Sequence, residues 1–382
     1  MKKELVARRN KLYELLPKGS MALIFGREVL HLIPSIPIPF DQHSDYFYLT
    51  GQKRPGGALA IYNEGGKAKS ALFLSKENSE TMFYGPTLSL EEVKSTSGVD
   101  SIFFSDELSS WASKHNLNHE NVYCSYPKSD RLFHIGSMFK SLSPYVDSLR
   151  VIKSKYEINL MKKASQITID SFPHVIQTIK PGDTEKMVVA RFENAVIERG
   201  ASGTAYPTLA LFGKNATYLH SINSNDTITE GQSLLLDGGA EVDHYASDFT
   251  RTVCIGKVSE IHSDTIKCVE SVKNDLVKIV KNGEVETLNQ LKEIAKGKLL
   301  SGLNEIGLKM DMNSLSYYFL HHTSHWVGLD VHDARSINFD RKLEKGMAFS
   351  VEPGLYFNPR FADCPKELRN VGIRFEDTVI LE

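Results

Sequence analysis

Four of the chain's 13 histidines lie within the segment HHTSHWVGLDVHD, residues 321–333. His321 and His325 are four residues apart, a spacing that on a helix would place two metal ligands on one face. However, no glutamate stands where a general base would be needed, and residues 327–332 alternate as a strand does. The segment cannot build a metal site alone, so we expect further ligands elsewhere in the chain.

Two aspartates lie in the segment SLLLDGGAEVDHYASDFTRTV, residues 233–253, which has the pattern of two strands around a turn. If the turn centres between Val242 and Asp243, Asp237 and Asp248 face each other with Cβ atoms about 5 Å apart. Two facing carboxylates repel unless a proton or a cation lies between them. The alternative is that one of the two aspartates faces solvent.

A second acidic pair narrows this choice. Glu352 in FSVEPGLYF and Glu376 in GIRFEDTVI are flanked by strand-forming apolar residues, and buried carboxylates are costly without a partner. Four acids and one histidine carry a charge of about −4, which two divalent ions would balance. The same two ions would activate a bound water molecule. Oxygen ligands favour Mn²⁺ over a thiolate-loving metal, with Co²⁺ and Zn²⁺ as alternatives.

The first part of the chain has the pattern of an α/β domain. Short apolar runs such as MALIF, ALAIY and ALFLS predict strands, and LSLEEVKS and DELSSWASK predict helices. We therefore expect a smaller α/β domain over residues 1–150.

The second part predicts an α+β domain over residues 151–382. Ser154 and Glu157 form a capping-box signature that opens a helix. Further helices are expected after Asp183, at about 262–281 and at about 287–300. Strand-rich segments with the pattern of antiparallel hairpins lie between and after them, at 232–255, 346–358 and 370–382.

Composition excludes several classes of partner. A net charge of −2 and a pI near 6.7 give no reason to expect nucleic acid or an anionic membrane. No apolar run approaches the roughly 18 residues of a membrane span, and the first residues are neither a signal nor a transit peptide. Four scattered cysteines favour free thiols, and we expect a cytoplasmic protein.

The residues singled out above resemble the metal-binding set of the pita-bread metallopeptidases, in the same order and in the same local motifs. Within that group, SHWVGLDVHD looks most like aminopeptidase P, as do YPTLALFGKNATYLH and IPFDQHSDYFYLTG. The resemblance implies an α+β pita-bread domain behind a smaller α/β domain. It implies a dinuclear metal site held by Asp237, Asp248, His325, Glu352 and Glu376.

The resemblance also divides the histidines among different roles. His325 resembles the one metal ligand, whereas His220 and His332 resemble the pair that hydrogen-bonds the scissile carbonyl and the tetrahedral species formed from it. His321 resembles a histidine of the proline pocket, and Arg374 an arginine on the substrate side. Glu352 is expected to act as both ligand and proton acceptor. His322 lies where many relatives have glycine and receives no role.

The implied activity is removal of the N-terminal residue from peptides whose second residue is proline, by a homo-oligomer, either a dimer or a tetramer. The nearest alternative is prolidase, which cleaves only X-Pro dipeptides. A catalytically silent binding module is a further alternative, although all five expected ligands are present. Two departures from the family pattern, Asp41 and Ser221, put fine specificity and subunit contacts in question.

Overall fold

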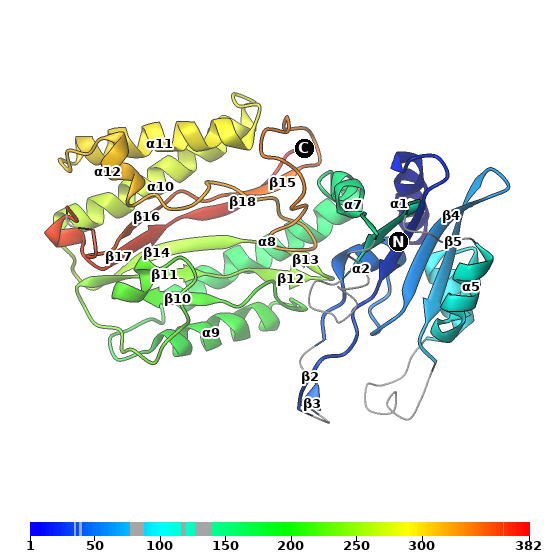
Figure 1. The fold of residues 1–382 in the computed structure, drawn as a ribbon. Helices are drawn as coiled ribbons and strands as arrows, with labels where there is room; N and C mark the ends of the chain where they lie inside the picture. The colour runs from blue at the N-terminus through cyan, green and yellow to red at the C-terminus, as the bar shows by residue number, and fades with distance from the viewer. Residues whose placement is uncertain (34–35, 38–39, 77–87, 116–119, 127–138, 362) are drawn as a thin grey trace. The chain divides into compact units, whose positions relative to one another are not determined.

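The structure is a computed structural model that describes residues 1–33, 36–37, 40–76, 88–115, 120–126, 139–361 and 363–382. The described chain forms two compact units, Met1–Leu149 and Arg150–Glu382 (Figure 1). Each unit has its own sheet and its own helices.

The first unit is built on a six-stranded mixed sheet with the strand order β6-β5-β4-β1-β7-β8. The strands expected from MALIF, ALAIY and ALFLS are confirmed as β1, β4 and β5. The elements of this unit are α1 (Lys2–Leu15), β1 (Met21–Phe25), β2 (His31–Ile33), β3 (Ile36–Pro37), α2 (Ser44–Thr50), β4 (Ala58–Glu64), β5 (Lys67–Leu74), α4 (Leu90–Ser97), β6 (Ser101–Phe104), the 3₁₀ helix η1 (Ser105–Glu107), α5 (Leu108–Lys114), β7 (Val122–Ser125), β8 (Lys140–Ser141) and α7 (Ser143–Arg150).

The segment IPFDQHSDYFYLTG is only partly visible, because residues 38–39 lie outside the described residues. Its Gln42 is buried and fastens the turn: the side-chain oxygen accepts from the Arg27 amide at 2.7 Å, and the side-chain nitrogen donates to the Arg54 carbonyl at 2.7 Å. Asp41 is exposed and lies 3.8 Å from the Arg27 guanidinium. The motif therefore has a structural role inside the first unit.

The second unit holds a five-stranded sheet, β10-β11-β14-β18-β15, with smaller sheets β13-β12-β9 and β16-β17 beside it. Its elements are α8 (Lys155–Ile176), α9 (Glu185–Glu198), β9 (Gly203–Thr204), β10 (Leu209–Phe212), η2 (Gly213–Thr217), β11 (Gln232–Asp237), β12 (Ala240–Val242), β13 (Tyr245–Ala246), β14 (Phe249–Ile255), α10 (Glu260–Lys281), α11 (Leu288–Glu305), α12 (Met312–Ser316), β15 (Ala348–Val351), β16 (Gly354–Phe357), η3 (Lys366–Leu368), β17 (Val371–Arg374) and β18 (Glu376–Ile380).

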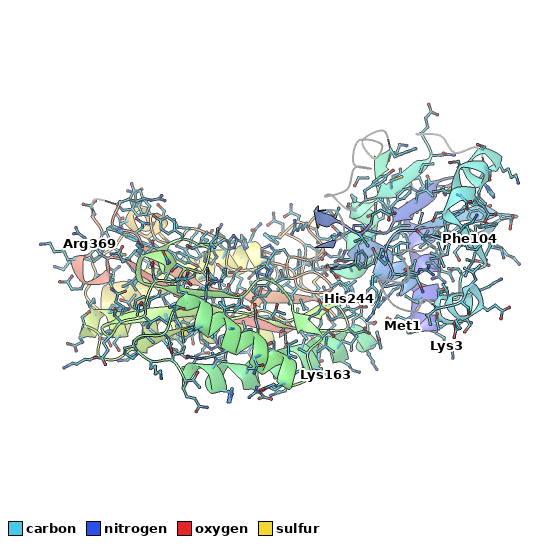
Figure 2. The ribbon with its side chains drawn as sticks, turned by 90° about the horizontal axis from the view of Figure 1, so that it is seen from below. Met1, Lys3, Phe104, Lys163, His244 and Arg369 are labelled. Carbon is cyan, nitrogen blue, oxygen red and sulfur yellow. The ribbon has the colours of Figure 1, made fainter. Side chains whose placement is uncertain are left out.

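Helices cover both sides of these strands. α8 and α9 run along one side, and α10 and α11 along the other (Figure 1). Exposed residues such as Lys163 mark the outer face of α8 (Figure 2). Since both faces of the sheet are covered, the interior strand β11 is buried along five of its six residues. This burial explains its continuous apolar run.

Local signals in the sequence set the ends of the helices. The predicted capping box of α8 is confirmed, since the Ser154 side chain accepts from the Glu157 amide and the Glu157 carboxylate accepts from the Ser154 amide. α10 begins after Ser259, whose side chain accepts from the His262 amide. Each cap satisfies a backbone donor that the first helical turn leaves without a partner.

The hairpin register expected for the two aspartates is wrong. The turn falls one residue later, at Asp243 and His244, which have φ values of 50° and 68°; His244 is labelled in Figure 2. Strand β11 therefore pairs Asp237 with Thr250, not with Asp248. Asp248 lies diagonally across from Asp237, two residues before Thr250 and directly before β14. Asx and His residues tolerate this left-handed backbone better than Val242 would, which is why the turn settles there.

One smaller expectation, the strand at residues 327–332, is also wrong. Beside the hairpin, the glycines at 238 and 239 allow close packing, because a Cβ at Gly239 would lie 1.8 Å from the Ser247 carbonyl oxygen. Residues 327–332 are not a strand but an irregular loop. The loop is fixed by one β-bridge between Trp326 and Phe349 and by a hydrogen bond from the Asp333 amide to the Trp326 carbonyl. Tertiary packing overrides the alternating pattern there.

Candidate metal centre

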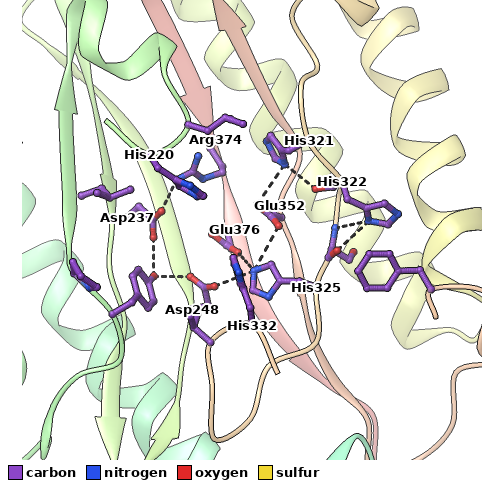
Figure 3. Close-up of a pocket in the computed structure, with 17 residues that line it drawn as sticks. His220, Asp237, Asp248, His321, His322, His325, His332, Glu352, Arg374 and Glu376 are labelled. Carbon is purple, nitrogen blue, oxygen red and sulfur yellow. Dashed lines mark hydrogen bonds and ion pairs between the residues drawn. The ribbon is translucent and has the colours of Figure 1, made fainter. Parts of the chain in front are cut away.

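One pocket in the second unit, with a volume of about 480 Å³, gathers every candidate site residue (Figure 3). The residues come from strands β11, β17 and β18, from the position just before β14, and from the loops around residues 220, 321–332 and 352. All nine residues chosen from the sequence line it: His220, Asp237, Asp248, His321, His325, His332, Glu352, Arg374 and Glu376. Six well-separated parts of the chain thus meet in one place.

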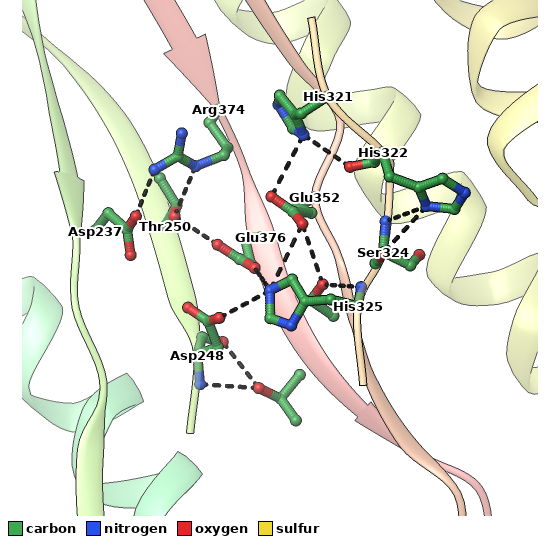
Figure 4. Close-up of polar contacts among 12 residues, drawn as sticks. Asp237, Asp248, Thr250, His321, His322, Ser324, His325, Glu352, Arg374 and Glu376 are labelled. Carbon is green, nitrogen blue, oxygen red and sulfur yellow. Dashed lines mark hydrogen bonds and ion pairs between the residues drawn. The ribbon is translucent and has the colours of Figure 1, made fainter. Parts of the chain in front are cut away.

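His325 is the point at which the acidic side chains converge (Figure 4). Its Nε2 lies 3.2 Å from Asp248 Oδ2, 3.6 Å from Glu352 Oε1 and 3.7 Å from Glu376 Oε1. Ligand atoms of Asp248, His325 and Glu376 all lie within 4.8 Å of one another. Three oxygens and one nitrogen that point at a common centre are a donor set for a divalent cation.

The electrostatics of this cluster favour the binding of positive charge. Burial and the nearby Glu376 carboxylate raise the pKa of Glu352 well above its usual value, and burial together with Asp248 raises the pKa of Glu376. Burial alone would lower the pKa of His325, but its bonds to Asp248 and Glu376 and the charge of Glu352 outweigh burial and raise it. The buried Glu376 Oε1 has no hydrogen-bond partner among the described residues. Divalent cations would satisfy all of these groups.

Asp237 stands beside this cluster, bound to its neighbours. Its Oδ2 forms an ion pair with Arg374, and its Oδ1 accepts a hydrogen bond of 2.7 Å from the Tyr206 hydroxyl. The same hydroxyl lies 2.5 Å from Asp248 Oδ1, so Tyr206 joins the two aspartates. Burial raises the pKa of Asp237, partly offset by Arg374. The diagonal placement of the aspartates thus still brings both carboxylates to one polar group.

A directed chain of hydrogen bonds orients His321. Arg374 donates to the Tyr356 hydroxyl at 2.8 Å, and that hydroxyl lies 2.9 Å from His321 Nε2. The other ring nitrogen, Nδ1, donates to the His322 carbonyl at 2.7 Å. Burial lowers the pKa of His321 to about 3, so the ring is neutral and Nε2 accepts from Tyr356. Both nitrogens are engaged, and Nδ1 also lies 3.5 Å from the Glu352 carboxylate.

The remaining three histidines lie at the rim of the pocket (Figure 3). His220 and His332 are exposed, and no side chain or carbonyl in the described ranges hydrogen-bonds either ring. The neutral His322 ring donates to the Asn289 side-chain oxygen at 3.1 Å and accepts from the Ser324 amide at 3.2 Å, and it packs on Phe339. The two rim histidines without ring partners are the ones with nitrogens available to a substrate.

Sequence reasoning missed three residues that hold the site together: Tyr206, Thr250 and Tyr356. Thr250 donates to Glu376 Oε2 at 2.7 Å and accepts from Arg374. Thr250 is the true cross-strand partner of Asp237, and Tyr356 follows Glu352 by four residues on the adjoining strand. The correct strand register would have pointed to Thr250, and the two-residue alternation of a strand to Tyr356.

Buried carboxylates that converge with histidine, with further histidines at the rim, define a metal-dependent hydrolase. Residues 159–382 match metallopeptidase family M24, and residues 5–123 match the aminopeptidase P N-terminal domain. The chain belongs to metallopeptidase family M24 and carries this N-terminal domain.

Individual relatives agree with this assignment. The mitochondrial intermediate cleaving peptidase 55 of Arabidopsis thaliana is 30% identical, over 99% of this chain and 78% of the relative. The Xaa-Pro aminopeptidase of Escherichia coli is 28% identical, over 100% and 92%. A solved structure of aminopeptidase P from E. coli covers 100% of this chain and 93% of its own, with 26% identity and a TM-score of 0.88. The predicted fold class is confirmed.

No helix in the described part of the chain is long and apolar enough to cross a membrane.

Proposed function

We propose that this protein is an Xaa-Pro aminopeptidase, which hydrolyses the bond between an N-terminal residue and a proline in the second position. The observation that carries the proposal is the single pocket in which four carboxylates and His325 meet, with two unengaged histidines at the rim. An X-Pro bond is a tertiary amide without an N–H. A peptidase for it must act on the carbonyl, and this pocket presents groups suited to that.

We assign the metal-holding role to Asp237, Asp248, His325, Glu352 and Glu376. Two divalent cations bound there would lower the pKa of a water molecule and polarise the substrate carbonyl. We propose Mn²⁺, because four of the five ligands offer oxygen.

The remaining roles belong to side chains that the substrate would meet. We assign Glu352 the role of accepting a proton from the attacking water, because its carboxylate lines the pocket beside His325. The free ring nitrogens of His220 and His332 would donate to the carbonyl oxygen as it gains charge. We assign His321, whose two ring nitrogens are both engaged, to the pocket for proline.

The rival is a prolidase, which must bind the carboxylate of an X-Pro dipeptide. Arg374 is the cation in the pocket wall best placed for that, but its guanidinium already binds Asp237, Tyr356 and Thr250. It is also only 4% exposed. A substrate carboxylate would have to displace three buried partners, which favours the aminopeptidase.

A panel of three peptides tests the proposal. We expect Ala-Pro-Ala to be cleaved fast, Ala-Pro slowly and Ala-Ala-Ala hardly at all, in assays with Mn²⁺. The third peptide matters because the Arabidopsis relative's name does not mention proline. If kcat/KM for Ala-Pro exceeds that for Ala-Pro-Ala tenfold, about 1.4 kcal/mol in the barrier, the protein is a prolidase.

We also propose a cytoplasmic location, a homo-oligomeric state and peptides with a proline in second place as partners. Four unpaired cysteines support a reducing compartment. Gel filtration with light scattering would distinguish a dimer from a tetramer.

A further inference from the structure

The loop that carries His220 is fixed more firmly at its ends than in its middle, where Leu219 is only partly buried. Before the histidine, η2 ends at Thr217; after it, Asn223 accepts from the Ala210 amide at 2.8 Å and donates to the Thr208 carbonyl at 2.7 Å. Between them, Ile222 is 88% exposed. Since the His220 ring has no hydrogen-bond partner among the described residues, its position depends on the anchors of its loop.

One carboxylate holds both ends of this loop. Glu185, in the first turn of α9, is fully buried. Its Oε1 accepts from the Phe212 amide at 2.7 Å and from the Asn215 side chain at 3.0 Å, on the side before the histidine. Its Oε2 accepts from the Ser224 amide at 2.6 Å, on the side after it. The two oxygens of one side chain thus close the loop.

We propose that Glu185 is a positioning residue that places His220 over the metal centre. All three groups that bind Glu185 are N–H donors, and an ionised carboxylate is the one side chain of this length that only accepts. A buried amide left without an acceptor costs free energy, so the loop closes only while both oxygens accept. This inference rests on the proposed function for the role of His220, but the closure of the loop does not.

Glu185→Gln is the sharpest test, because glutamine has the same shape but must turn an NH₂ group toward one of the two loop ends. We expect faster amide hydrogen exchange in residues 209–224. We also expect kcat on Ala-Pro-Ala to fall about tenfold with little change in KM. That loss is smaller than the roughly 10²–10³-fold loss expected when His220, an oxyanion donor, is removed.

Glu157→Gln is the matched control. Glu157 is also buried, and its carboxylate accepts from the Ser154 amide and from the Tyr245 hydroxyl at 3.1 Å. A hydroxyl can accept as well as donate, so glutamine can bond to both groups. This variant should leave the exchange of residues 209–224 unchanged. Glu185→Asp, which keeps two acceptor oxygens, replaces the glutamine variant if that protein does not fold.

A double-mutant cycle separates positioning from general damage. If Glu185 acts through His220, Glu185→Gln should change kcat less than twofold in a His220→Ala background. Equal losses in both backgrounds, or unchanged exchange in residues 209–224, would overturn the proposal. A wild-type protein that cleaves no peptide would refute the proposed function instead, and the exchange comparison would still decide whether Glu185 closes the loop.

Discussion

At the scale of single residues, the four clustered histidines differ in what their ring nitrogens contact. His325 meets three carboxylates, and His321 meets a hydroxyl, a carbonyl and the Glu352 carboxylate. His322 meets the Asn289 side-chain oxygen and the Ser324 backbone amide. The ring of His332 has no such partner within the described residues. These contacts distinguish the proposed metal ligand, His325, from His321 and His322, whose rings are held in place, and from the proposed substrate-facing donor, His332. Residue type alone does not make that distinction.

The acidic centre and the rim histidine should respond differently to substitution. Asp248 and Glu376 belong to the tightest group of donor atoms, so Asp248→Ala and Glu376→Ala should bind fewer than the two Mn²⁺ ions expected per wild-type chain and lose activity completely. His332→Ala should keep both ions and lose about 10²–10³ in kcat. Elemental analysis beside peptide kinetics checks both. Near-normal kcat in His332→Ala would return that residue to a structural role.

His322 should make the metal-free protein less stable in acid. Burial, and then the charge of Lys292, lower the pKa of His322 to about 4 from an ordinary 6.5. Between these values the unfolded chain binds a proton that the folded protein does not, so the free energy of unfolding falls as pH falls from 6.5 toward 4. In His322→Gln the difference in that free energy between pH 7 and pH 5 should shrink.

Urea unfolding at the two pH values measures this difference. His174→Gln, which replaces an exposed histidine on α8, is the control and should follow the wild type. If His322→Gln also follows the wild type, the His322 ring is already accessible to protons in the folded state.

At the scale of elements, the sequence predicted most helices and strands but not their exact pairing. Capping residues and apolar spacing locate α8 and α10 because those signals are local. The register of β11 against β14 depends on which residues accept a left-handed turn, and the sequence pattern placed that turn one residue too early. The loop 327–332 alternates like a strand, but strand-type pairing there is limited to the single bridge between Trp326 and Phe349. The candidate residues still line one pocket, because the diagonal placement of Asp237 and Asp248 keeps both carboxylates at the Tyr206 hydroxyl.

A buried ion pair fastens that loop to the segment before α8. Asp333, next to His332, is bound by Arg150 and lies 3.2 Å from Lys153 Nζ, with all three side chains at most 6% exposed. Removing the carboxylate takes the ion-pair partner from the buried Lys153, although Arg150 keeps Asp330, so Asp333→Ala should lower the free energy of unfolding by about 3–5 kcal/mol. Urea unfolding of the metal-free protein measures the loss.

Asp330 provides an internal comparison, since it also binds Arg150, at 2.7 Å, but its side chain is 47% exposed. Asp330→Ala should cost about 1 kcal/mol or less, because solvent screens an exposed pair. Similar small losses in both variants would mean that Asp333 gains little from its buried position.

At the scale of the whole molecule, the candidate chemistry belongs to one unit. Every residue that lines the pocket falls between Tyr206 and Glu376, inside the unit Arg150–Glu382. That unit also contains two large apolar cores, one around α10 and α11 and one around α8 and α9. The first unit has a separate core on its six-stranded sheet. Independent cores are what allow domains to fold separately.

A fragment of residues 150–382 should therefore fold and bind divalent cations on its own. It retains Arg150 and Lys153, which fasten the His332 loop, and Glu185, which closes the His220 loop. We expect about two Mn²⁺ per fragment, with a raised melting temperature when the ions are added, since a ligand that binds only the folded state stabilises it. Calorimetry and elemental analysis on the fragment and the full chain, side by side, make the comparison. A fragment that folds but binds no ions, beside a full chain that binds two, would mean that the first unit is needed to form the site.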